Sequence, residues 1–329
     1  MSENRKKDHI ELAKVSQTQT PSSDFIYEPL LSPHPGQMDL SLNFAGANLK
    51  APMWISSMTG GTQRAQLINK NLTTIAGEFG FGMGLGSCRS LLESDERIKD
   101  FDFKHLIGDF PFYINLGIAQ LEQLIEKNSV AKIQQLISKL HADGLVIHVN
   151  PLQEWFQPEG DRFKVSPIET IKSIVKRLDT KIIVKEVGQG FGPNSLKSLM
   201  ELPIAAIELS GFGGTNFSLL ELSRHNAQKS DNKWSKDKLV DVGHTCDQMI
   251  NWINPLIEQE STKCKQFIIS GGIKCLLDGY SLQEKLKADS VIGMASAFLD
   301  YAEDLDKLRE FVASELESYK IARSYLQGK

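Results

Sequence analysis

The expected fold rests on one stretch of the sequence, Gly144-Leu145-Val146-Ile147-His148-Val149-Asn150-Pro151-Leu152-Gln153-Glu154. Its first half is a short apolar run with the length and composition of a buried β-strand. His148 and Asn150 stand two positions apart, so their side chains should point to one face of the strand end. Polar groups therefore gather where a strand ends, which is where (β/α)8 barrels place their catalytic groups.

Further apolar runs of strand length occur along the chain, most of them separated by helical stretches. We expect strands over residues 52–56, 81–85, 112–114, 145–149, 181–184, 204–209, 267–270 and 290–292. Such alternation implies parallel pairing with right-handed crossovers, and eight units imply a closed TIM barrel. An open doubly wound sheet is the structural alternative, but it does not require polar residues after every strand. One long helix is expected over residues 120–141.

The domain organisation predicted from this pattern is an arm followed by one barrel. Residues 1–50 precede the first strong strand and are expected to form an N-terminal arm that contributes to the substrate site. Residues 51–329 are expected to form a single catalytic domain. Residues 218–263 exceed the length of one crossover helix, so an insertion is predicted after strand six.

Composition argues against two classes of partner. The chain has 329 residues, 41% hydrophobic, and a net charge of -4 without a basic stripe, which disfavours nucleic acid. Apolar runs stay well short of the roughly 18 residues needed to span a bilayer, and the charged N-terminus lacks the apolar core of a signal peptide. The four cysteines show no CxxC spacing, so we expect free thiols in a reducing cytoplasm.

Glycine-rich turns follow three successive predicted strands. They are Ser210-Gly211-Phe212-Gly213-Gly214-Thr215, Ser270-Gly271-Gly272 and Gly293-Met294-Ala295. Glycine lets backbone N–H groups approach an anion closely, and TIM barrels commonly bind phosphate at this rim. One such turn is weak evidence, because glycine also serves tight turns. Three side by side predict a phosphate site.

Charged residues suggest further roles. Lys185 ends an otherwise apolar strand and should face the barrel mouth, where it could sit against the edge of a flavin ring. The alternatives are an ion pair with a neighbouring carboxylate, or a Schiff base. Glu154 suits a hard cation such as Mg2+. The segment Arg5-Lys6-Lys7-Asp8-His9, which should open a short helix through Lys14, is either a solvated basic tail or a clamp for a phosphorylated ligand.

Together these motifs resemble the type 2 isopentenyl-diphosphate isomerases, which are FMN-dependent TIM-barrel enzymes. The resemblance runs from Arg5 to about Phe298. The matching signatures, in order, are Arg5-Lys6-x-x-His9, Met58-Thr59-Gly60-Gly61, His148-x-Asn150-x-x-Gln153-Glu154-x-x-x-Pro158-Glu159-Gly160, Lys185-Glu186-Val187-Gly188 and Gly213-Gly214-Thr215-Asn216-Phe217.

The resemblance implies a role for each matching residue. The substrate diphosphate would be gripped by Arg5, Lys6, Ser87 and Arg89. The residues expected to act on the substrate are Gln153, His148 and Asn150, and Glu154 would bind Mg2+. The residues expected to hold FMN are Ser57, Met58, Thr59, Gly60, Ser87, Asn115, Lys185, Ser210, Thr215, Gly271, Gly272, Ile273, Gly293, Met294 and Ala295.

The implied reaction converts isopentenyl diphosphate into dimethylallyl diphosphate without net redox change. Reduced FMN would act as acid and base through its N5 edge, and NAD(P)H would serve to reduce the flavin. The resemblance also implies a homotetramer or larger homo-oligomer. Two rival functions stay open: a net-redox flavoenzyme, such as a 2-hydroxy-acid oxidase or a dihydroorotate-dehydrogenase-like protein, and a non-enzymatic barrel that binds a phosphorylated ligand.

Three residues depart from the family pattern. Cys88 stands where the family often has glutamine, which puts a substrate contact there in doubt. Lys274 replaces an arginine after strand seven, and it keeps the charge but loses the planar fork. Lys287 replaces a glycine before Ala288. We expect FMN binding to survive these changes with altered affinity.

Overall fold

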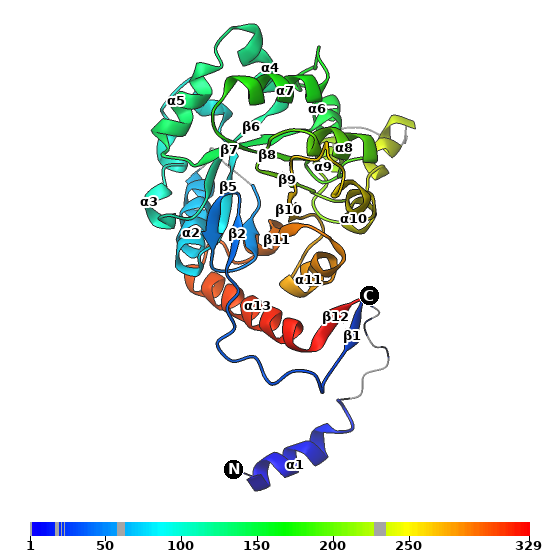
Figure 1. Cartoon of the computed structure of the whole chain (residues 1–329). Helices are drawn as coiled ribbons and strands as arrows, with labels where there is room; N and C mark the ends of the chain where they lie inside the picture. Colours follow the sequence, from blue (N-terminus) through cyan, green and yellow to red (C-terminus); the bar gives the residue numbers. More distant parts are fainter. Residues whose placement is uncertain (1, 17–19, 21, 23, 58–62, 227–234) are drawn as a thin grey trace.

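The computed structural model describes residues 2–16, 20, 22, 24–57, 63–226 and 235–329. Its centre is a closed barrel of parallel strands that pair in chain order, with the last strand returning to the first. The strands are β4 (Met53–Ile55), β5 (Gly82–Ser87), β6 (Phe112–Gly117), β7 (Gly144–His148), β8 (Lys181–Lys185), β9 (Ala206–Glu208), β10 (Gln266–Ile269) and β11 (Asp289–Met294). The predicted TIM barrel is confirmed (Figure 1).

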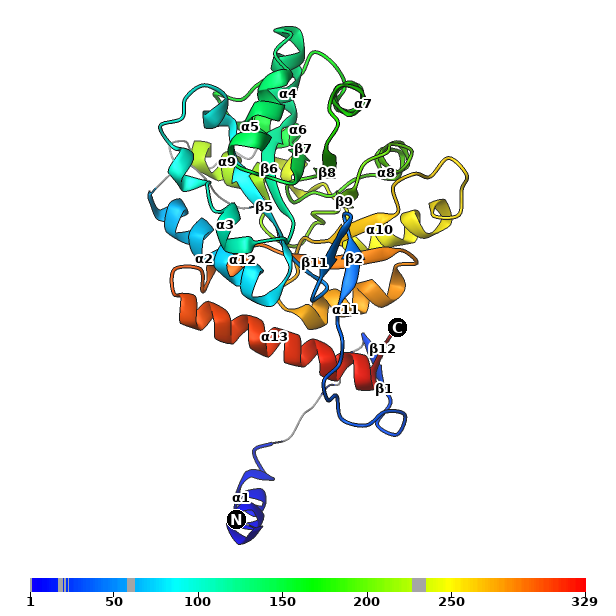
Figure 2. The ribbon, with the colours of Figure 1, turned by 60° about the vertical axis from the view of Figure 1, so that its left-hand side comes forward.

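Helices surround the barrel on its outer side, as Figure 2 shows from a second direction. The longer ones are α2 (Gln63–Phe79), α4 (Ile118–Glu126), α5 (Ala131–Lys139), α7 (Pro167–Arg177), α8 (Pro193–Met200), α9 (Phe217–Asn226), α10 (Cys246–Ile253), α11 (Leu276–Lys285) and α13 (Leu305–Tyr325). Shorter turns are α3 (Lys104–Ile107), α6 (Pro151–Phe156), α12 (Ser296–Leu299), η1 (Arg89–Leu92), η2 (Ile98–Asp100), η3 (Ser235–Asp241) and η4 (Asn254–Leu256). None of the described helices has the length and apolar character needed to cross a membrane.

The single helix predicted over residues 120–141 is wrong. The structure has two helices there, α4 and α5, with a turn between them. Asn128 in that turn has φ +51°, a left-handed conformation that an α-helix does not contain. Asparagine tolerates this conformation better than most residues, so it ends one helix and lets the chain restart at Ala131.

The strands fill the barrel with two layers of side chains. The lower layer is apolar and comprises Trp54, Tyr113, Val146, Ile183, Ala206, Ile268 and Val291. Because inward-facing residues recur every second position, the next layer toward the carboxyl ends is Ser56, Asn115, His148, Lys185, Glu208, Ser270 and Gly293. An apolar floor therefore lies beneath a polar barrel mouth.

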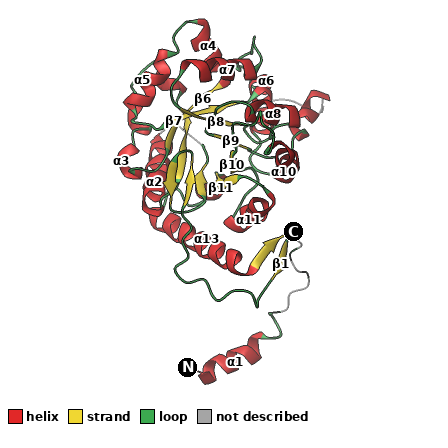
Figure 3. Cartoon of the chain, viewed as in Figure 1, coloured by secondary structure: helices red, strands yellow, loops and turns green. Residues whose placement is uncertain are grey.

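A β-hairpin closes the opposite end of the barrel. It consists of β2 (Leu42–Phe44) and β3 (Ala47–Leu49), which pair antiparallel. Phe44 is fully buried and makes an edge contact with Trp54 at a centroid distance of 6.0 Å. Lys181, the first residue of β8, donates from Nζ to the carbonyl of Gly46. The amino-terminal end of the barrel is thus plugged, and the carboxyl end carries the polar groups. Figure 3 shows the strands of the barrel with the helices around them.

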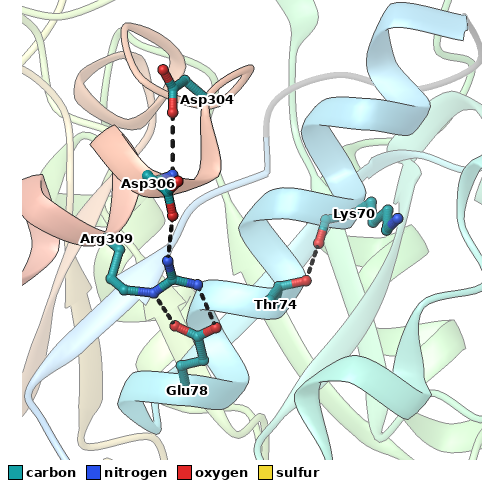
Figure 4. Close-up of polar contacts among 6 residues, drawn as sticks. All are labelled: Lys70, Thr74, Glu78, Asp304, Asp306 and Arg309. Carbon is teal, nitrogen blue, oxygen red and sulfur yellow. Dashed lines mark hydrogen bonds and ion pairs between the residues drawn. The ribbon is translucent and has the colours of Figure 1, made fainter.

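The C-terminal helix α13 is fixed to α2, the first helix of the barrel. Arg309 of α13 donates to both carboxylate oxygens of Glu78 at 2.8 Å and also to Asp306 at 2.7 Å (Figure 4). The guanidinium holds the pKa of Glu78 below its usual value. The pair is partly exposed, so solvent screens it and its contribution to the free energy of unfolding is small.

The N-terminal arm is attached at the far end of the chain. β1 (Phe25–Tyr27) pairs antiparallel with β12 (Leu326–Gly328), next to the end of α13. Helix α1 (Ser2–Leu12) lies apart from the barrel in both views. Residues 218–263 contain most of α9, together with η3, α10 and η4. Of these elements, α10 packs between α8 and α11 and serves as the crossover helix.

Candidate active site

A hollow of about 70 Å3 opens at the carboxyl end of the barrel, directly above the apolar floor. It brings together residues from five strand ends. Predicted cofactor residues that line it are Ser57, Lys185, Ser210, Thr215, Gly271, Gly272, Ile273, Gly293 and Ala295. Ser56, Glu208 and Ser270 of the polar layer line it as well. The structure therefore brings these nine predicted residues together, whereas the predicted residues Asn115, His148, Asn150, Gln153 and Glu154 do not line this hollow.

Backbone packing explains the glycines around this hollow. A Cβ atom on Gly271 would lie 2.1 Å from the backbone nitrogen of Gly211, and the residue has φ +103°. A Cβ on Gly214 would lie 2.6 Å from the nitrogen of Gly272. The turns after β9 and β10 thus touch backbone to backbone. Ser210, beside them, holds φ +46°, a strained value for a residue with a side chain.

His148 is held in one orientation by a neighbouring strand. Its Nδ1 lies 2.8 Å from the Oδ1 atom of Asn115, so Nδ1 carries the proton and Nε2 is left to accept a hydrogen bond. Burial lowers the pKa of His148 to about 3, and the positive charges of Lys185 and Arg89 add to this effect. The ring is therefore neutral at physiological pH.

A second network follows β7 directly. The Nδ2 group of Asn150 donates to Oε1 of Gln153 at 3.0 Å and to Oε1 of Glu154 at 3.1 Å. The other carboxylate oxygen of Glu154 accepts the backbone N–H of Asp161 at 2.7 Å. Glu154 is buried, and Oδ1 of Asn150 is buried without a hydrogen-bond partner among the described residues. This arrangement offers oxygen atoms that a hard cation could use.

The metal prediction at Glu154 involves one carboxylate and not a cluster. Within the ranges that the structure describes, no group of three or more His, Cys, Asp or Glu side chains is placed to hold a metal ion. Mg2+ commonly binds through one or two carboxylates, with substrate phosphates and water completing its shell. The donor set at Glu154 and Asn150 fits a metal of that kind and does not fit a cage made wholly of protein.

Lys185 and Glu208 face each other across β8 and β9. They are register partners, with 6% and 1% of their surfaces exposed. The Nζ of Lys185 donates to the main-chain carbonyl of Glu186 at 2.6 Å. Oε1 of Glu208 accepts from the hydroxyl of Ser270 at 3.2 Å, while its Oε2 has no partner among the described residues.

Several predicted site residues lie outside this hollow or face away from it. Met58, Thr59 and Gly60 fall outside the described residues. The side chains of Ile273 and Met294 belong to the main hydrophobic core, so their backbones are what a ligand can reach. Ser87 and Arg89 are exposed at the end of β5. Arg5 and Lys6 are exposed on α1, and the structure does not bring them to the barrel mouth.

None of the three residues that depart from the family pattern lines this hollow. Cys88 is fully buried in the main core, and its thiol donates to the carbonyl of Gly86 at 3.3 Å. Burial raises its pKa to about 12. Lys274 and Lys287 are exposed, and neither lines the hollow. Cys88 therefore directs its side chain away from the mouth.

Sequence reasoning missed polar residues of the barrel mouth. Glu208 interrupts an apolar strand in the same way as Lys185, and that signal could have identified it. Ser56 alternates with buried apolar residues, but serine in a strand is too common to single out, and Ser270 was noted only as the first residue of a glycine-rich turn. Asp161 was not predicted to fix Glu154, because its contact is made by the backbone N–H and does not depend on the side chain.

A larger cavity of about 480 Å3 lies beside the site, between α6, α7 and α8. Its lining includes Val149, Leu152, Ile171, Glu186 and His244, and it contains neither lysine nor arginine among the described residues. A diphosphate would lack a cationic partner there. The polar barrel mouth, with Lys185 inside and Arg89 nearby, is the better candidate for an anionic ligand.

Comparison with known proteins gives relatives over most of the chain. The chain is 33% identical over 315 residues to "isopentenyl-diphosphate delta-isomerase" of Rickettsia peacockii, which covers 92% of this chain and 87% of the relative. The proteins of the same name from Rickettsia africae and Rickettsia canadensis are 32% and 34% identical, and cover 96% and 84% of this chain. No protein-family model matches the sequence.

Solved structures support the fold. The flavin-binding domain of baker's yeast flavocytochrome b2 aligns with a TM-score of 0.59 at 13% identity, covering 92% of this chain and 71% of that one. A lactate oxidase of Pediococcus acidilactici aligns with a TM-score of 0.57 at 11% identity, covering 93% and 83%. These likenesses concern architecture alone. Given the curated relatives, this chain belongs to the isopentenyl-diphosphate delta-isomerase family.

Proposed function

We propose that this protein converts isopentenyl diphosphate into dimethylallyl diphosphate at the carboxyl end of the barrel, using FMN and Mg2+. The proposal is supported by two hydrogen-bonded groups at the carboxyl ends of β6 and β7. Asn115 is bonded to His148, and Asn150 is bonded to both Gln153 and Glu154. These five residues do not line the hollow between the glycine turns, but His148 is the register partner of Lys185, which does. Family membership supplies the substrate.

The polar mouth suits a flavin with a phosphate group. The hydroxyls of Ser56 and Ser57 are buried without a hydrogen-bond partner among the described residues, so they are available to a ligand. A Cβ on Gly293 would lie 2.9 Å from the hydroxyl of Ser56, so a side chain at this position would crowd the cavity. Backbone N–H groups of the glycine turns would receive the phosphate. Solved structures of the same fold include a mandelate oxidase with an FMN adduct.

The residues proposed to hold FMN extend from this cavity to the neighbouring strands. They are Ser57, Met58, Thr59, Gly60, Ser87, Asn115, Lys185, Ser210, Thr215, Gly271, Gly272, Ile273, Gly293, Met294 and Ala295. When bound in its reduced form, FMN supplies the acid and base that add a proton at one carbon and remove one from another. NAD(P)H is proposed as the source of reducing equivalents.

Substrate binding relies on charge placed at a distance from the reacting carbons. Arg89 and Ser87 stand exposed at the end of β5, where they can receive diphosphate oxygens. Glu154 would hold Mg2+ against the same diphosphate. Arg5 and Lys6 would complete the clamp when the N-terminal arm moves toward the mouth. Binding energy gained on the diphosphate can then orient the hydrocarbon part of the substrate.

The protein's side chains would orient the alkene and exclude water. His148 is neutral, so it would accept a hydrogen bond through Nε2 without placing a positive charge beside a developing carbocation. Gln153 would contact the substrate through its amide, which Asn150 fixes. The apolar floor beneath the polar layer keeps water from entering from below. Water would trap a carbocation, so this exclusion matters to the reaction.

We also propose how the chain is divided into functional parts and how its copies assemble. Residues 1–50 would act as an N-terminal arm that contributes to the substrate site through α1, although its hairpin β2–β3 closes the other end of the barrel. Residues 51–329 would act as one catalytic domain, with residues 218–263 as an insertion in it. We further propose a cytoplasmic homo-oligomer, a homotetramer or larger. Light scattering of the purified protein measures the oligomeric state independently of activity.

A second candidate function is a net-redox reaction on a 2-hydroxy acid. The solved structures that share the fold include mandelate oxidase and flavocytochrome b2, which favours this alternative. The two functions differ in stoichiometry. An oxidase consumes one hydroxy acid for each flavin reduced, whereas the isomerase leaves the oxidation state of its substrate unchanged. Proton NMR of isopentenyl diphosphate incubated with the protein, reduced FMN and Mg2+ therefore tests the proposal, and failure to form dimethylallyl diphosphate would contradict it.

A further inference from the structure

Glu208 is a buried carboxylate at the barrel mouth that has no role in the reaction proposed above. Only 1% of its surface is exposed. Burying an ionised group is costly unless another group compensates its charge. Its one hydrogen bond comes from the hydroxyl of Ser270, and its Oε2 atom has no partner among the described residues. A neutral hydroxyl does not offset a negative charge.

The compensating charge lies on the adjacent strand. Lys185 is the register partner of Glu208, and neighbouring strands run about 4.8 Å apart. The side chains of both residues point inward from the same layer of the barrel, and both line the hollow. The ammonium of Lys185 is bound to the carbonyl of Glu186, which is also neutral. Lys185 and Glu208 are thus opposite charges at paired positions of β8 and β9, and the carboxylate of Glu186 also lies within electrostatic reach of Lys185.

We propose that Glu208 is a positioning residue that balances Lys185 and so sets the net charge beside the bound flavin. The inference rests on the proposed function, because it requires a flavin in this cavity. Lys185 alone would favour the reduced, negatively charged form of the ring. With Glu208 ionised beside it, the pair is neutral overall, and the preference for that form is weakened.

The test is the reduction potential of the bound flavin in Glu208→Gln, measured by anaerobic equilibration with a reference dye. The substitution keeps the shape of the side chain and removes its charge. We expect reduction to become about tenfold more favourable, which is a rise of about 30 mV for a two-electron couple. Glu208→Asp retains the charge and should stay close to the wild-type potential.

Glu122→Gln is the matched control. Glu122 is also buried, with one carboxylate oxygen unpartnered among the described residues, but it lies on α4 outside the barrel. Its replacement should leave the potential unchanged. If Glu208→Gln does not fold, Lys185→Met gives the reciprocal measurement, because the uncompensated carboxylate should then lower the potential.

The outcomes separate the inference from the proposed function. Wild-type protein that binds no flavin would contradict the proposed function. A bound flavin whose potential is the same in wild type and in Glu208→Gln would overturn the inference and leave the isomerase proposal standing. A potential that falls in Glu208→Gln, or that is unchanged in Lys185→Met, would overturn it as well.

Discussion

Asn115 and His148 form a hydrogen bond of 2.8 Å between the adjacent strands β6 and β7. The bond fixes the ring of His148 with its Nε2 atom available to a ligand. The buried position lowers its pKa to about 3, against 6.5 for an exposed histidine. His148 is consequently an uncharged hydrogen-bonding group and is poorly suited to act as a general acid near neutral pH.

This lowered pKa predicts the acid sensitivity of the fold. Between about pH 6.5 and pH 3 the unfolded chain binds a proton at His148 that the folded chain does not, so the free energy of unfolding falls as the pH decreases. His148→Gln removes this contribution. Its urea midpoint should fall less than that of wild type between pH 7.5 and 5, by an amount equivalent to at most about 2 kcal/mol. His105→Gln, at an exposed position, is the control, and an identical pH response in all three proteins would contradict the assignment.

Glu154 is predicted to set the requirement for Mg2+. In Glu154→Gln, the Mg2+ concentration needed for half-maximal activity should rise by about 10- to 100-fold, because the carboxylate ligand is lost. FMN binding, followed by the quenching of flavin fluorescence, should stay unchanged. Glu159→Gln, an exposed carboxylate in the same loop, should match wild type in both measurements. An unaltered Mg2+ dependence in Glu154→Gln would remove the metal from this residue.

Gln153 is predicted to act on the substrate and not on the flavin. Its amide is oriented by Asn150, so Gln153→Ala should lower kcat by roughly 100-fold, the cost of one oriented polar contact in a reaction site. The dissociation constant for FMN should change little. Steady-state kinetics and a flavin titration on the same preparation measure both quantities. Wild-type turnover in Gln153→Ala would exclude the residue from the site.

The cations of α1 are predicted to contribute to substrate affinity alone. Because Arg5 and Lys6 are exposed and α1 lies apart from the barrel, Arg5→Ala and Lys6→Ala should not alter the thermal midpoint of unfolding. Each should raise KM for isopentenyl diphosphate by about tenfold, the value of one charge-assisted hydrogen bond. Lys14→Ala is the control, because it removes another exposed positive charge from the arm and should leave KM unchanged. An unchanged KM in both variants would leave α1 without a role in binding.

Cysteine reactivity tests the position of Cys88. Burial raises the pKa of Cys88 and Cys246 to about 12, and Cys264 is buried as well, whereas Cys275 is partly exposed. Iodoacetamide at pH 8 should therefore modify Cys275 first, and peptide mass spectrometry locates the label. Early modification of Cys88 in folded protein would mean that its thiol faces the mouth.

Much of the site could be predicted because strand ends in a barrel share one rim. Eight apolar runs predict the architecture, and some of the residues that follow them line one cavity, as Lys185, Ser210 and Gly272 do. The pairing of β1 with β12 could not be predicted, because it joins segments about 300 residues apart. The break between α4 and α5 was missed because a left-handed asparagine looks like any other helical polar residue in sequence. The outward direction of Cys88 could not be predicted, because this residue follows the end of β5, where the register with β6 shifts.

The most direct test of the central claim is the number of turnovers per reducing equivalent. Purified protein with FMN, Mg2+ and isopentenyl diphosphate would be kept anaerobic, reduced with a limiting amount of NADPH or dithionite, and followed by proton NMR. We predict many molecules of dimethylallyl diphosphate for each molecule of reductant, because the reaction leaves the oxidation state unchanged. No product in the presence of bound, reduced flavin, or one product per reductant, would contradict the account.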